Sequence, residues 1–535
     1  MNKPLEFILT KKIFIFIFIG YLFSQYVFDS NSDKRYALRE IKLIEGELEP
    51  IDLLHSPYID YKQKLYRIDF LKNNKLSVAP VIALRYSKSG FEMDSSLTND
   101  KVWMTPGVKI RSLIPITYNN FPTGITIISW FDFYKHSAYG LKERISDNYI
   151  SIRSLSSYLC NSYDDEERCS SSLQHANYYF KYNPLYFNEY ASKSKWPDTG
   201  IDFDESKGGV VIDGKNFDLF YGKFRSSIGP FKSGNLSISQ TAPSFQQLKI
   251  LWTFNSKYNF SYLIGSLNSN VIDWDKTIGS YNNLNGVERN INYFSYIERY
   301  IVNHRFDYRT SNFRIGFYEQ VIFGSRLPLI YLNPITFYWS AQHQLGDLDN
   351  LQMGFDMEYL NGKNRFYFAF MADEWAPFNT FRNDAHNWFA TQIGISRLIN
   401  ISSYKVLLKH ETTLIDPQVY SHKFPINEPK HHNYYLGFWT GSDSENYFSS
   451  VSIFNSNYSI IFSDNFSLFG LSEYHVQASQ GTYNKKRRKT EMRIEMPYNE
   501  YLYFDCYISN INSSGIYNIN NYIDVGISIR FGIDY

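Results

Sequence analysis

Charged residues at alternating positions are the first candidates for chemistry in this sequence of 535 residues. In HRFDYR (304–309), Arg305, Asp307 and Arg309 would share one face of a strand, because side chains at every second position point to the same side. Acids elsewhere could pair with them, and a path for ions or a polysaccharide along the same face is the alternative. The members we expect in a charge network are Arg305, Arg309, Glu319, Asp347, Asp349, Asp356 and Asp373.

Three further patterns could suggest catalysis or metal binding, and each lacks part of what that chemistry needs. DLDN (347–350) lacks the ordered ligand spacing and the closing Glu of an EF-hand. Three histidines between residues 422 and 432 fall in an expected loop, without a helix to fix their spacing for a metal. Asp373 and Glu374 are adjacent, so on a strand their carboxylates would point to opposite faces. We therefore predict no catalytic residue, no metal site and no cofactor.

The C-terminal strand indicates which element would position the charges. Residues 522–535 alternate between an apolar face, which includes Ile523 and Val525, and a polar face, which includes Arg530. This pattern is typical of a strand between lipid and a wet barrel lumen. The chain then ends on Tyr535, and an aromatic end after such a strand resembles the signal that barrel-insertion machinery recognises.

The composition also favours a membrane barrel. The chain has 46 Tyr and 43 Phe, yet its mean hydropathy is −0.36. Alternating lipid-facing and lumen-facing residues, with aromatic girdles at both interfaces, produce such a balance. An array of soluble β-sandwiches would need several domains at this length, and no Pro/Gly/Ser-rich linker separates them. The 54 basic and 53 acidic side chains nearly cancel, which argues against a nucleic-acid partner.

The N-terminus predicts export. Three lysines within the first twelve residues precede an apolar run from 13 to 23, and Ser24 offers a small residue at a cleavage point. A basic start, about 7–15 apolar residues and a small residue are typical of a secretory signal. A membrane anchor helix would need roughly 20 apolar residues. We predict that residues 1–24 are a cleaved signal peptide.

The mature chain divides into two parts. Residues 25–75 should form an N-terminal periplasmic segment with one or two short helices, because ALREIKLIEGEL (37–48) has helical spacing. Residues 76–535 should form the barrel, with an ordered insertion at about 154–206 and a long loop at 270–293. The clearest strand-like runs are 78–86, 108–116, 124–134, 217–224, 247–255 and 259–267.

Counting strands backwards from the C-terminus gives an orientation. If the last residue lies on the periplasmic side, segments 511–521 and NKKRRK (484–489) lie outside the cell, and the turn at 497–500 lies in the periplasm. The same count places a turn at SDN (463–465) in the periplasm and NSNY (455–458) outside. It predicts an all-β fold, a transmembrane antiparallel β-barrel of roughly 18 strands in the cell outer membrane.

Three blocks of motifs stand out in the middle of the chain. They are YGKFRSSIGPFKSGNLSISQTAPSFQQLKI (221–250); HRFDYR (304–309) with GFYEQVIFG (316–324) and YLNPITFYWSAQHQLGDLDNLQMGFDMEY (331–359); and FMADEW (370–375) with TTLIDPQVYSHKF (412–424) and LGFWTGSDSENY (436–447). Together these blocks resemble the capsule assembly Wzi family of outer-membrane proteins. The departure is Ile228, where the family pattern leads us to expect a Trp.

The resemblance implies a barrel whose periplasmic end is plugged or capped by short helical segments. It also implies a non-catalytic role in attaching or organising an extracellular, capsular polysaccharide at the cell surface. The expected partners are outer-membrane lipid, lipopolysaccharide, the polysaccharide and the barrel-assembly machinery, with the chain as a monomer. A general diffusion porin is the alternative, and an outer-membrane hydrolase is a more distant one.

Aromatic, amide and cationic side chains in the expected external segments could bind such a polymer. Sugar rings pack on aromatic faces, and five consecutive cations would attract an anionic polymer through charges that salt screens. Lipopolysaccharide phosphates are the alternative partner for the cations, and interface anchoring is the alternative role of the tyrosines. The candidates are Lys485, Lys486, Arg487, Arg488, Lys489, Asn457, Tyr458 and Tyr517.

Overall fold

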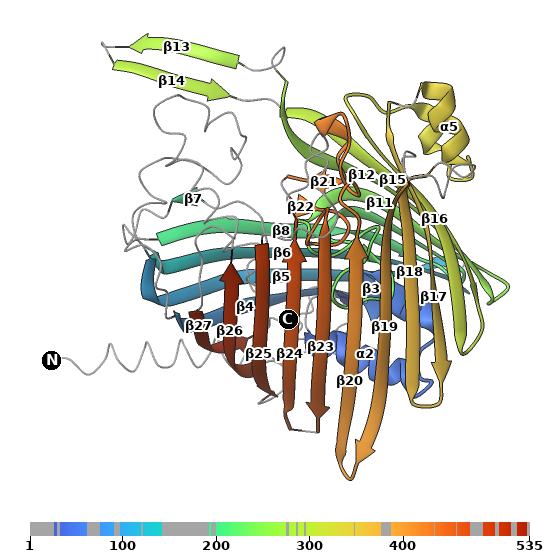
Figure 1. The fold of residues 1–535 in the computed structure, drawn as a ribbon, viewed down its shortest axis with the longest axis vertical. Coiled ribbons are helices and arrows are strands. Elements are labelled where there is room, and N and C mark those ends of the chain that lie inside the picture. The colour runs from blue at the N-terminus through green and yellow to red at the C-terminus, as the bar shows by residue number, and fades with distance from the viewer. Residues whose placement is uncertain are drawn as a thin grey trace.

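A closed antiparallel barrel of eighteen strands dominates the computed structural model (Figure 1), which confirms the predicted fold class. Each strand pairs with its neighbour in the chain order, and the last strand pairs with the first. The barrel strands are β4 (Lys75–Ser89), β5 (Leu97–Tyr118), β6 (Phe121–Leu141), β8 (Gly200–Asp213), β9 (Phe217–Phe224), β11 (Phe245–Phe254), β12 (Tyr258–Ile272), β15 (Tyr296–Arg309), β16 (Phe313–Gly324), β17 (Asn350–Asn361), β18 (Asn364–Glu374), β19 (Trp388–Ile401), β20 (Tyr404–Ile415), β23 (Ser444–Phe454), β24 (Ser459–Phe469), β25 (Lys485–Pro497), β26 (Leu502–Ser514) and β27 (Tyr522–Phe531).

The structure describes most of the chain, with gaps. The described residues are 26–28, 33–60, 75–89, 97–118, 121–141, 192–193, 200–273, 278–284, 287–293, 296–346, 348–375, 387–432, 434–455, 457–470, 485–497, 502–514 and 522–531. The predicted signal peptide, most of the predicted insertion at 154–206, Asp347 and Tyr517 lie outside these ranges.

The two ends of the barrel differ in their connections. At one end, which we call the short-turn end, strands meet in tight turns, as at 362–363 and 402–403. Gly362 and Ser402 have φ of 58° and 53° there, in the left-handed region that two-residue hairpin turns favour. At the other end, the long-loop end, the strands are joined by longer segments such as 416–443.

The predicted strand count between residues 455 and 500 was partly wrong. Residues 463–465 form no turn, because they lie in the middle of β24. The connection between β23 and β24 begins at Asn455, and it lies at the end of the barrel where β25 ends at Pro497. Residues 485–489 are the first residues of β25 and not a loop.

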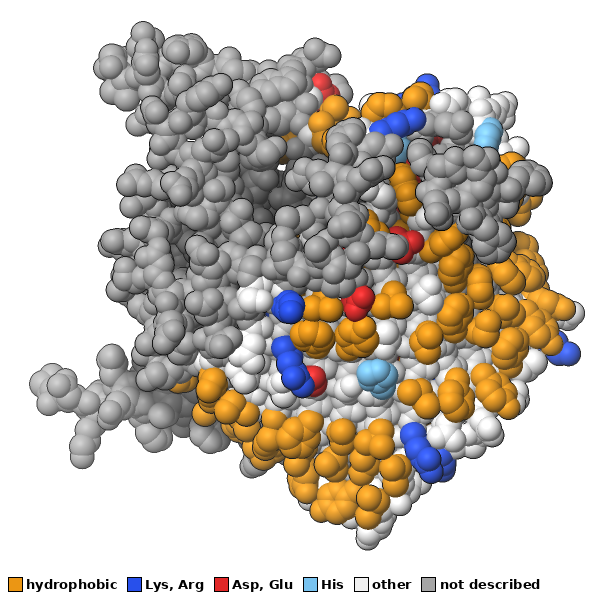
Figure 2. All heavy atoms as spheres, in the orientation of Figure 1, with side chains coloured by type: hydrophobic (Ala, Val, Ile, Leu, Met, Phe, Trp, Pro, Cys, Tyr) orange, Lys and Arg blue, Asp and Glu red, His pale blue; other side chains and the backbone are white. Residues whose placement is uncertain are grey.

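Side chains alternate between the lumen and the outer wall, as the sequence pattern of the last strand predicts. On β27, Ile523 and Ile527 point outward with 52% and 59% of their surface exposed, whereas Ser528 and Arg530 point inward and are buried. Figure 2 shows broad apolar areas over the viewed face of the wall. Among the helices that the structure describes, none combines the length and the apolar character needed to cross a membrane.

Two segments fold into the lumen. The N-terminal plug (residues 33–57) contains the expected short helices, α2 (Asp33–Ile44) and α3 (Pro50–Leu54), followed by β2 (His55–Ser56). The inner segment (residues 225–244) joins β9 to β11, and its strand β10 (Ser227–Ile228) pairs with β2. The shorter β1 (Tyr26–Phe28) pairs with β3 (Tyr58–Asp60).

The remaining elements belong to connections at the long-loop end. The predicted loop 270–293 contains a hairpin of β13 (Ile278–Leu284) and β14 (Val287–Tyr293), because both runs pair in register. The outer segment (residues 325–349) contains η3 (Leu329–Leu332) and α5 (Tyr338–Leu345). The small elements are β7 (Ser192–Lys193), η5 (Pro425–Asn427), β21 (Lys430–His431) and β22 (Tyr434–Tyr435).

Candidate functional site

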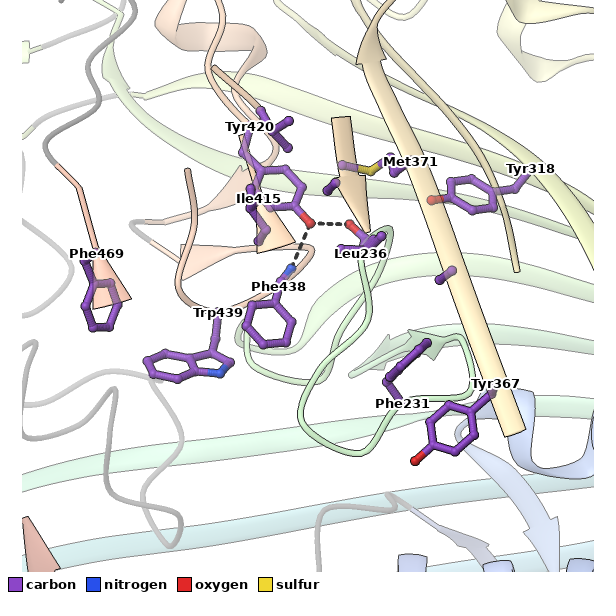
Figure 3. Close-up of a cluster of buried hydrophobic side chains, with 13 residues drawn as sticks. Phe231, Leu236, Tyr318, Tyr367, Met371, Ile415, Tyr420, Phe438, Trp439 and Phe469 are labelled. Atoms are coloured by element: carbon purple, nitrogen blue, oxygen red, sulfur yellow. Dashed lines mark hydrogen bonds between the residues drawn. The ribbon is translucent and has the colours of Figure 1, made fainter. Parts of the chain in front are cut away.

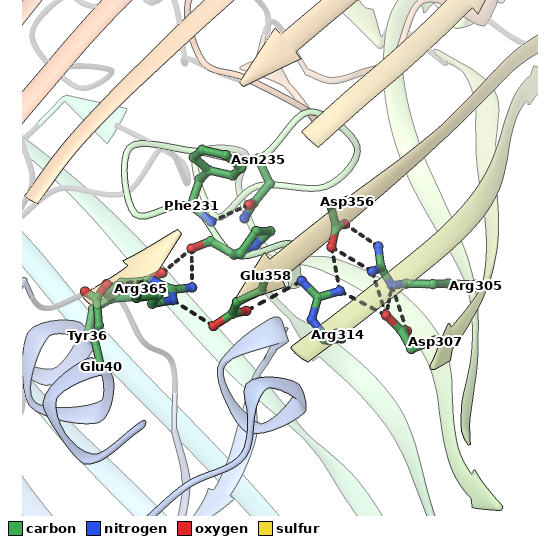
Figure 4. Close-up of polar contacts among 11 residues, drawn as sticks. Tyr36, Glu40, Phe231, Asn235, Arg305, Asp307, Arg314, Asp356, Glu358 and Arg365 are labelled. Carbon is green, nitrogen blue, oxygen red and sulfur yellow. Dashed lines mark hydrogen bonds and ion pairs between the residues drawn. The ribbon is translucent and has the colours of Figure 1, made fainter. Parts of the chain in front are cut away.

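A network of buried charges lines the lumen face of β15, β16 and β17 (Figure 4). Arg305 bonds to Asp307 at 2.7 Å on its own strand and to Asp356 at 2.5 Å on β17. Arg314 on β16 bonds to the same two carboxylates at 3.0 and 2.5 Å. The structure therefore brings together Arg305 and Asp356, two of the residues that the sequence assigned to a charge network.

The network continues from the wall to the N-terminal plug. Arg365 on β18 lies between Glu358 on β17, at 2.7 Å, and Glu40 on α2, at 2.6 Å. Lys409 on β20 also pairs with Glu40 and lies 3.9 Å from Glu411. Because Arg365 and Glu40 are fully buried, this contact between helix and wall is shielded from solvent.

Charge balance explains why these groups can be buried. Burial alone would raise the pKa of Glu40, but Lys409 and Arg365 lower it to about 2. Glu411 has additional partners in the inner segment, the backbone N–H groups of Lys232 at 3.0 Å and Ser233 at 2.8 Å. Unpaired buried charges would be strongly unfavourable, so the network holds both segments in place.

The plug and the inner segment also contact each other directly. The Tyr36 hydroxyl donates to the Pro230 carbonyl at 2.6 Å, and the Gly229 N–H donates to the Leu54 carbonyl at 3.0 Å. Gly229 has φ of 140°, and a Cβ there would lie 2.2 Å from Oδ1 of Asn235. Only glycine fits this position, since a side chain would collide with Asn235 and alter the fold of the inner segment.

A second contact of the inner segment is mainly apolar (Figure 3). The Tyr420 hydroxyl donates to the Leu236 carbonyl at 2.6 Å and accepts from the Phe438 N–H at 3.1 Å. Phe231 packs edge-on against Tyr367, with ring centroids 4.8 Å apart. All five residues belong to the blocks of family resemblance or to the strands beside them. The blocks thus meet around the inner segment.

Several residues expected in the charge network lie elsewhere. Glu319 points to the outer wall, in phase with Phe317, so its assignment to the lumen was wrong. Asp349 was also wrongly assigned, because it accepts from the Tyr331 hydroxyl at 2.5 Å within the outer segment's cluster. Arg309 pairs with Glu49 at the short-turn end. Asp373 does face the lumen, where it accepts the backbone N–H of Tyr420.

Four of the five consecutive cations, residues 486–489, are divided between two faces because they are on a strand. Arg487 is buried on the lumen face, 5.8 Å from the centre of the Trp439 ring, and Lys489 on that face pairs with Glu491 at 2.7 Å. Lys486 and Arg488 are exposed on the outer face. Arg488 pairs with Asp464 at 2.9 Å. The prediction of one cationic loop was therefore wrong.

Asn457 and Tyr458 lie at the end opposite to these cations. Their backbone N–H groups donate to Oδ1 of Asn455 at 2.8 and 3.0 Å, which closes the turn between β23 and β24. The prediction that this turn and the turn after Pro497 lie at opposite ends was wrong, since the strand boundaries place the end of β23 and the end of β25 at the same end of the barrel. These two residues cannot share a binding site with the β25 cations.

The described residues contain no cluster of three or more His, Cys, Asp or Glu side chains that could hold a metal. His431 accepts the backbone N–H of Asn268 at 2.9 Å, and burial lowers its pKa well below the ordinary value. A cavity of about 530 Å³ lies at the short-turn end, between the plug and the wall, and its charged lining includes Arg39, Asp52, Asp218 and Arg309.

No family model and no curated protein matches the sequence. Among solved structures, the chain is similar to Wzi of Escherichia coli, described as an outer-membrane protein involved in group 1 capsule assembly and a carbohydrate-binding β-barrel. The TM-score is 0.46 at 11% identity, over 84% of this chain and 85% of that one. It is also similar to OccAB4 of Acinetobacter baumannii, with TM-score 0.41, 10% identity and coverage of 86% and 98%. A third similar structure is OpdK of Pseudomonas aeruginosa, solved with vanillate. Its TM-score is 0.40 at 9% identity, over 86% of this chain and 99% of that one. These values assign no function and no site residue.

Proposed function

We propose that this chain is an outer-membrane barrel with a closed lumen that attaches or organises an extracellular polysaccharide at the cell surface. The observation that carries the proposal is the convergence of the three sequence blocks that resemble the Wzi family. Residues 225–244 of the first block fold into the lumen, where Gln320 of the second block donates to the Ser237 carbonyl and Tyr420 of the third block donates to the Leu236 carbonyl. Residues of the blocks that resemble the Wzi family thus help to hold the inner segment in the lumen.

The outer wall supports a position in a membrane. Apolar side chains cover its outward positions, and lumen-facing arginines such as Arg305 and Arg530 are buried. Mid-membrane Arg or Lys on the lipid face would cost about 2–4 kcal/mol, which favours this arrangement. Bacterial barrels keep short turns on the periplasmic side. The short-turn end then faces the periplasm, and the long-loop end faces the medium.

The buried carboxylates support a structural rather than a catalytic role. Asp307, Asp356 and Glu358 are each bonded to arginines, and Asp373 is bonded to a backbone N–H group. Carboxylates held in this way fix neighbouring segments and are withheld from a substrate. The proposal therefore assigns these residues to closing the lumen.

Polymer contact belongs at the long-loop end in this proposal. Lys486 and Arg488 are the members of the cation cluster that are exposed there, and Lys423 on another loop is exposed as well. Arg487 and Lys489 would act from the lumen side. Replacing Lys486 and Arg488 with Ser should reduce retention of an anionic polymer most at low ionic strength, because salt screens exposed charges over roughly 8–10 Å.

Gene deletion tests the role in the cell. Cells without the chain should release polysaccharide that wild-type cells keep attached, and an unchanged ratio of attached to released polymer would contradict the proposal. Planar-bilayer recording tests the closed lumen independently. The purified protein should give little stable conductance, whereas large stable open currents would favour a general diffusion porin.

A further inference from the structure

The outer segment covers part of the outside of the barrel wall. Val321 and Phe323 on β16 alternate with lumen-facing residues and so point outward, yet their exposed fractions are 0% and 1%. Phe317, nearer the short-turn end on the same face, is 56% exposed. The residues of the outer segment that bury this area are Tyr331, Tyr338 and Ala341. Figure 1 shows α5 outside the wall, beside β16 and β17.

Polar contacts with Glu319 and His304 help to fix the outer segment to the wall. The Glu319 carboxylate on β16 accepts the backbone N–H groups of Tyr338 at 2.8 Å and Trp339 at 3.3 Å, at the N-terminus of α5. His304 on β15 lies 2.9 Å from the same carboxylate and donates from Nδ1 to the Pro334 carbonyl at 2.9 Å. An outward carboxylate thus has partners from the chain itself.

The backbone of the outer segment forms its own hydrogen bonds. The N–H of Tyr331 donates to the Pro328 carbonyl at 3.1 Å, and the N–H of Thr336 donates to the Asn333 carbonyl at 3.2 Å. The N–H of Gly346, with φ of 90°, donates to the His343 carbonyl at 3.2 Å and closes the end of α5. Satisfied backbone groups are what lipid requires of any segment that it surrounds.

The side of the outer segment that faces away from the barrel is apolar. Leu329 and Ile335 are 79% and 82% exposed, and Phe337 and Trp339 are 58% and 41% exposed. The sequence from 327 to 346 contains no Asp, Glu, Lys or Arg. A connection surrounded by water would gain from charged side chains, and so large an exposed apolar face indicates a binding surface.

We propose that this face is immersed in the acyl chains of the membrane leaflet on the long-loop side. The proposal rests on the membrane position proposed above. It extends the lipid-facing surface, because the face continues the outward apolar positions of the strands that it covers, such as Phe306 and Phe317, 47% and 56% exposed. Trp339 would lie near the headgroups, where aromatic rings with one polar atom are favoured.

Nitroxide labelling in lipid vesicles tests the proposal. Cys160, Cys169 and Cys506 are replaced with Ser, and a single cysteine is introduced as Ile335→Cys. Collision of the label with oxygen, which concentrates in lipid, is compared with collision with a water-soluble nickel chelate. The label at Ile335 should behave as lipid-exposed, with oxygen collisions dominant. Dominant nickel collisions, or protection from both reagents by a bound protein, would each overturn the proposal.

Two control positions separate the failure of this proposal from that of the membrane position. Phe317→Cys, on the exposed wall, should report lipid, and Lys423→Cys, on an exposed loop at the long-loop end, should report water. Lipid at Phe317 with water at Ile335 overturns the immersion alone, whereas water at both positions overturns the membrane position itself.

The unmodified chain provides a second measurement in case the labelled variants do not fold. Vesicles are prepared with a phospholipid that carries a photoactivatable diazirine in its acyl chain, and the crosslinked peptides are identified. Crosslinks in 329–339 and in β16 support the proposal. Crosslinks in β16 without any in 329–339 overturn it.

Discussion

The inner segment and the outer segment both fold back on the barrel wall, and different forces hold them. Residues 225–244, inside, receive buried hydrogen bonds from charged groups: Arg365 donates to the Pro230 carbonyl at 2.9 Å, and Glu411 accepts two backbone N–H groups. Residues 325–349, outside, pack through aromatic rings and one carboxylate, Glu319. The difference follows from the surroundings, because a lumen admits charged partners and lipid does not.

Strand β16 contacts the inner segment with one face and the outer segment with the other. Gln320 points into the lumen and donates to the Ser237 carbonyl of the inner segment at 3.4 Å, whereas Glu319 and Val321, one position away on either side, point to the outer segment. Alternation along one strand therefore supplies amide partners to one segment and an apolar surface to the other. Each segment should respond to a different class of substitution.

The largest expected effect is on the N-terminal plug, from Arg365→Met. Removing one partner of a buried ion pair costs about 3–5 kcal/mol, because Glu40 and Glu358 would be left without this cation. Hydrogen exchange at α2 should accelerate strongly, while exchange at α5 should not change.

The matched control for this variant is Glu45→Gln, one residue beyond the C-terminal end of the same helix. Glu45 pairs with Lys405, whose side chain is 46% exposed, and such surface pairs contribute about 0–1 kcal/mol. Comparable acceleration at α2 in the two variants would contradict the role assigned to the buried network.

The outer segment should respond to Glu319→Ala by a smaller amount. The substitution leaves the N–H groups of Tyr338 and Trp339 without their acceptor, and an unsatisfied buried group costs about 1–3 kcal/mol. Exchange at α5 should accelerate and exchange at α2 should not. Glu428→Ala, whose ion pair with Lys430 has side chains 25% and 24% exposed, is the control. Faster exchange at α2 in Glu319→Ala would show that the two segments are not independent.

The barrel could be predicted from the sequence because its pattern is local. The alternation that separates Ile523 and Val525 from Arg530 is visible along one strand, and so is the separation of Arg305 and Asp307 from Phe306. The prediction made from this alternation was wrong where we misplaced the strand boundaries. At 455–465 one false turn reversed the parity and moved Asn457 and Tyr458 to the wrong end.

The complete network could not be predicted, because its members meet only after the barrel closes. Glu40 is 325 positions from Arg365 in the sequence, and its helix gave only an amphipathic pattern. Alternation around Glu358 and Lys409 could have suggested their lumen-facing positions, but not their partners. Glu319 was misassigned because an acid on an outward position is unexpected until the outer segment that covers it is known.

A smaller effect is expected in the apolar contact of the inner segment, from Tyr420→Phe. The Leu236 carbonyl and the Phe438 N–H lose a shared hydroxyl partner, at the lower end of about 1–3 kcal/mol for a buried unsatisfied group. Bilayer recording should show brief openings that the wild type lacks, because the inner segment loses a hydrogen bond that holds Leu236 in the lumen. Tyr221→Phe, on the outer wall with 57% exposure, is the control and should stay closed.

The smallest effect at neutral pH, and a growing one in acid, is expected for the junction between plug and wall. Burial lowers the pKa of His55 well below its ordinary value of 6.5, and the positive charges of Lys249, Arg305 and Arg314 lower it further. Because the folded protein holds His55 neutral, its contribution to docking is complete above about pH 6.5 and falls as the pH drops below that value. Glu40, with its pKa lowered from 4.5 to about 2, contributes fully above about pH 4.5 and loses that contribution as the pH falls toward 2.

Acidification should therefore loosen the plug in two steps, first through His55 and then through Glu40. The mobility of a nitroxide at the exposed Glu47→Cys, in the cysteine-free chain, measures both steps. Adding His55→Phe should abolish the upper step and keep the lower one. An upper step that persists in this variant would assign it to another group.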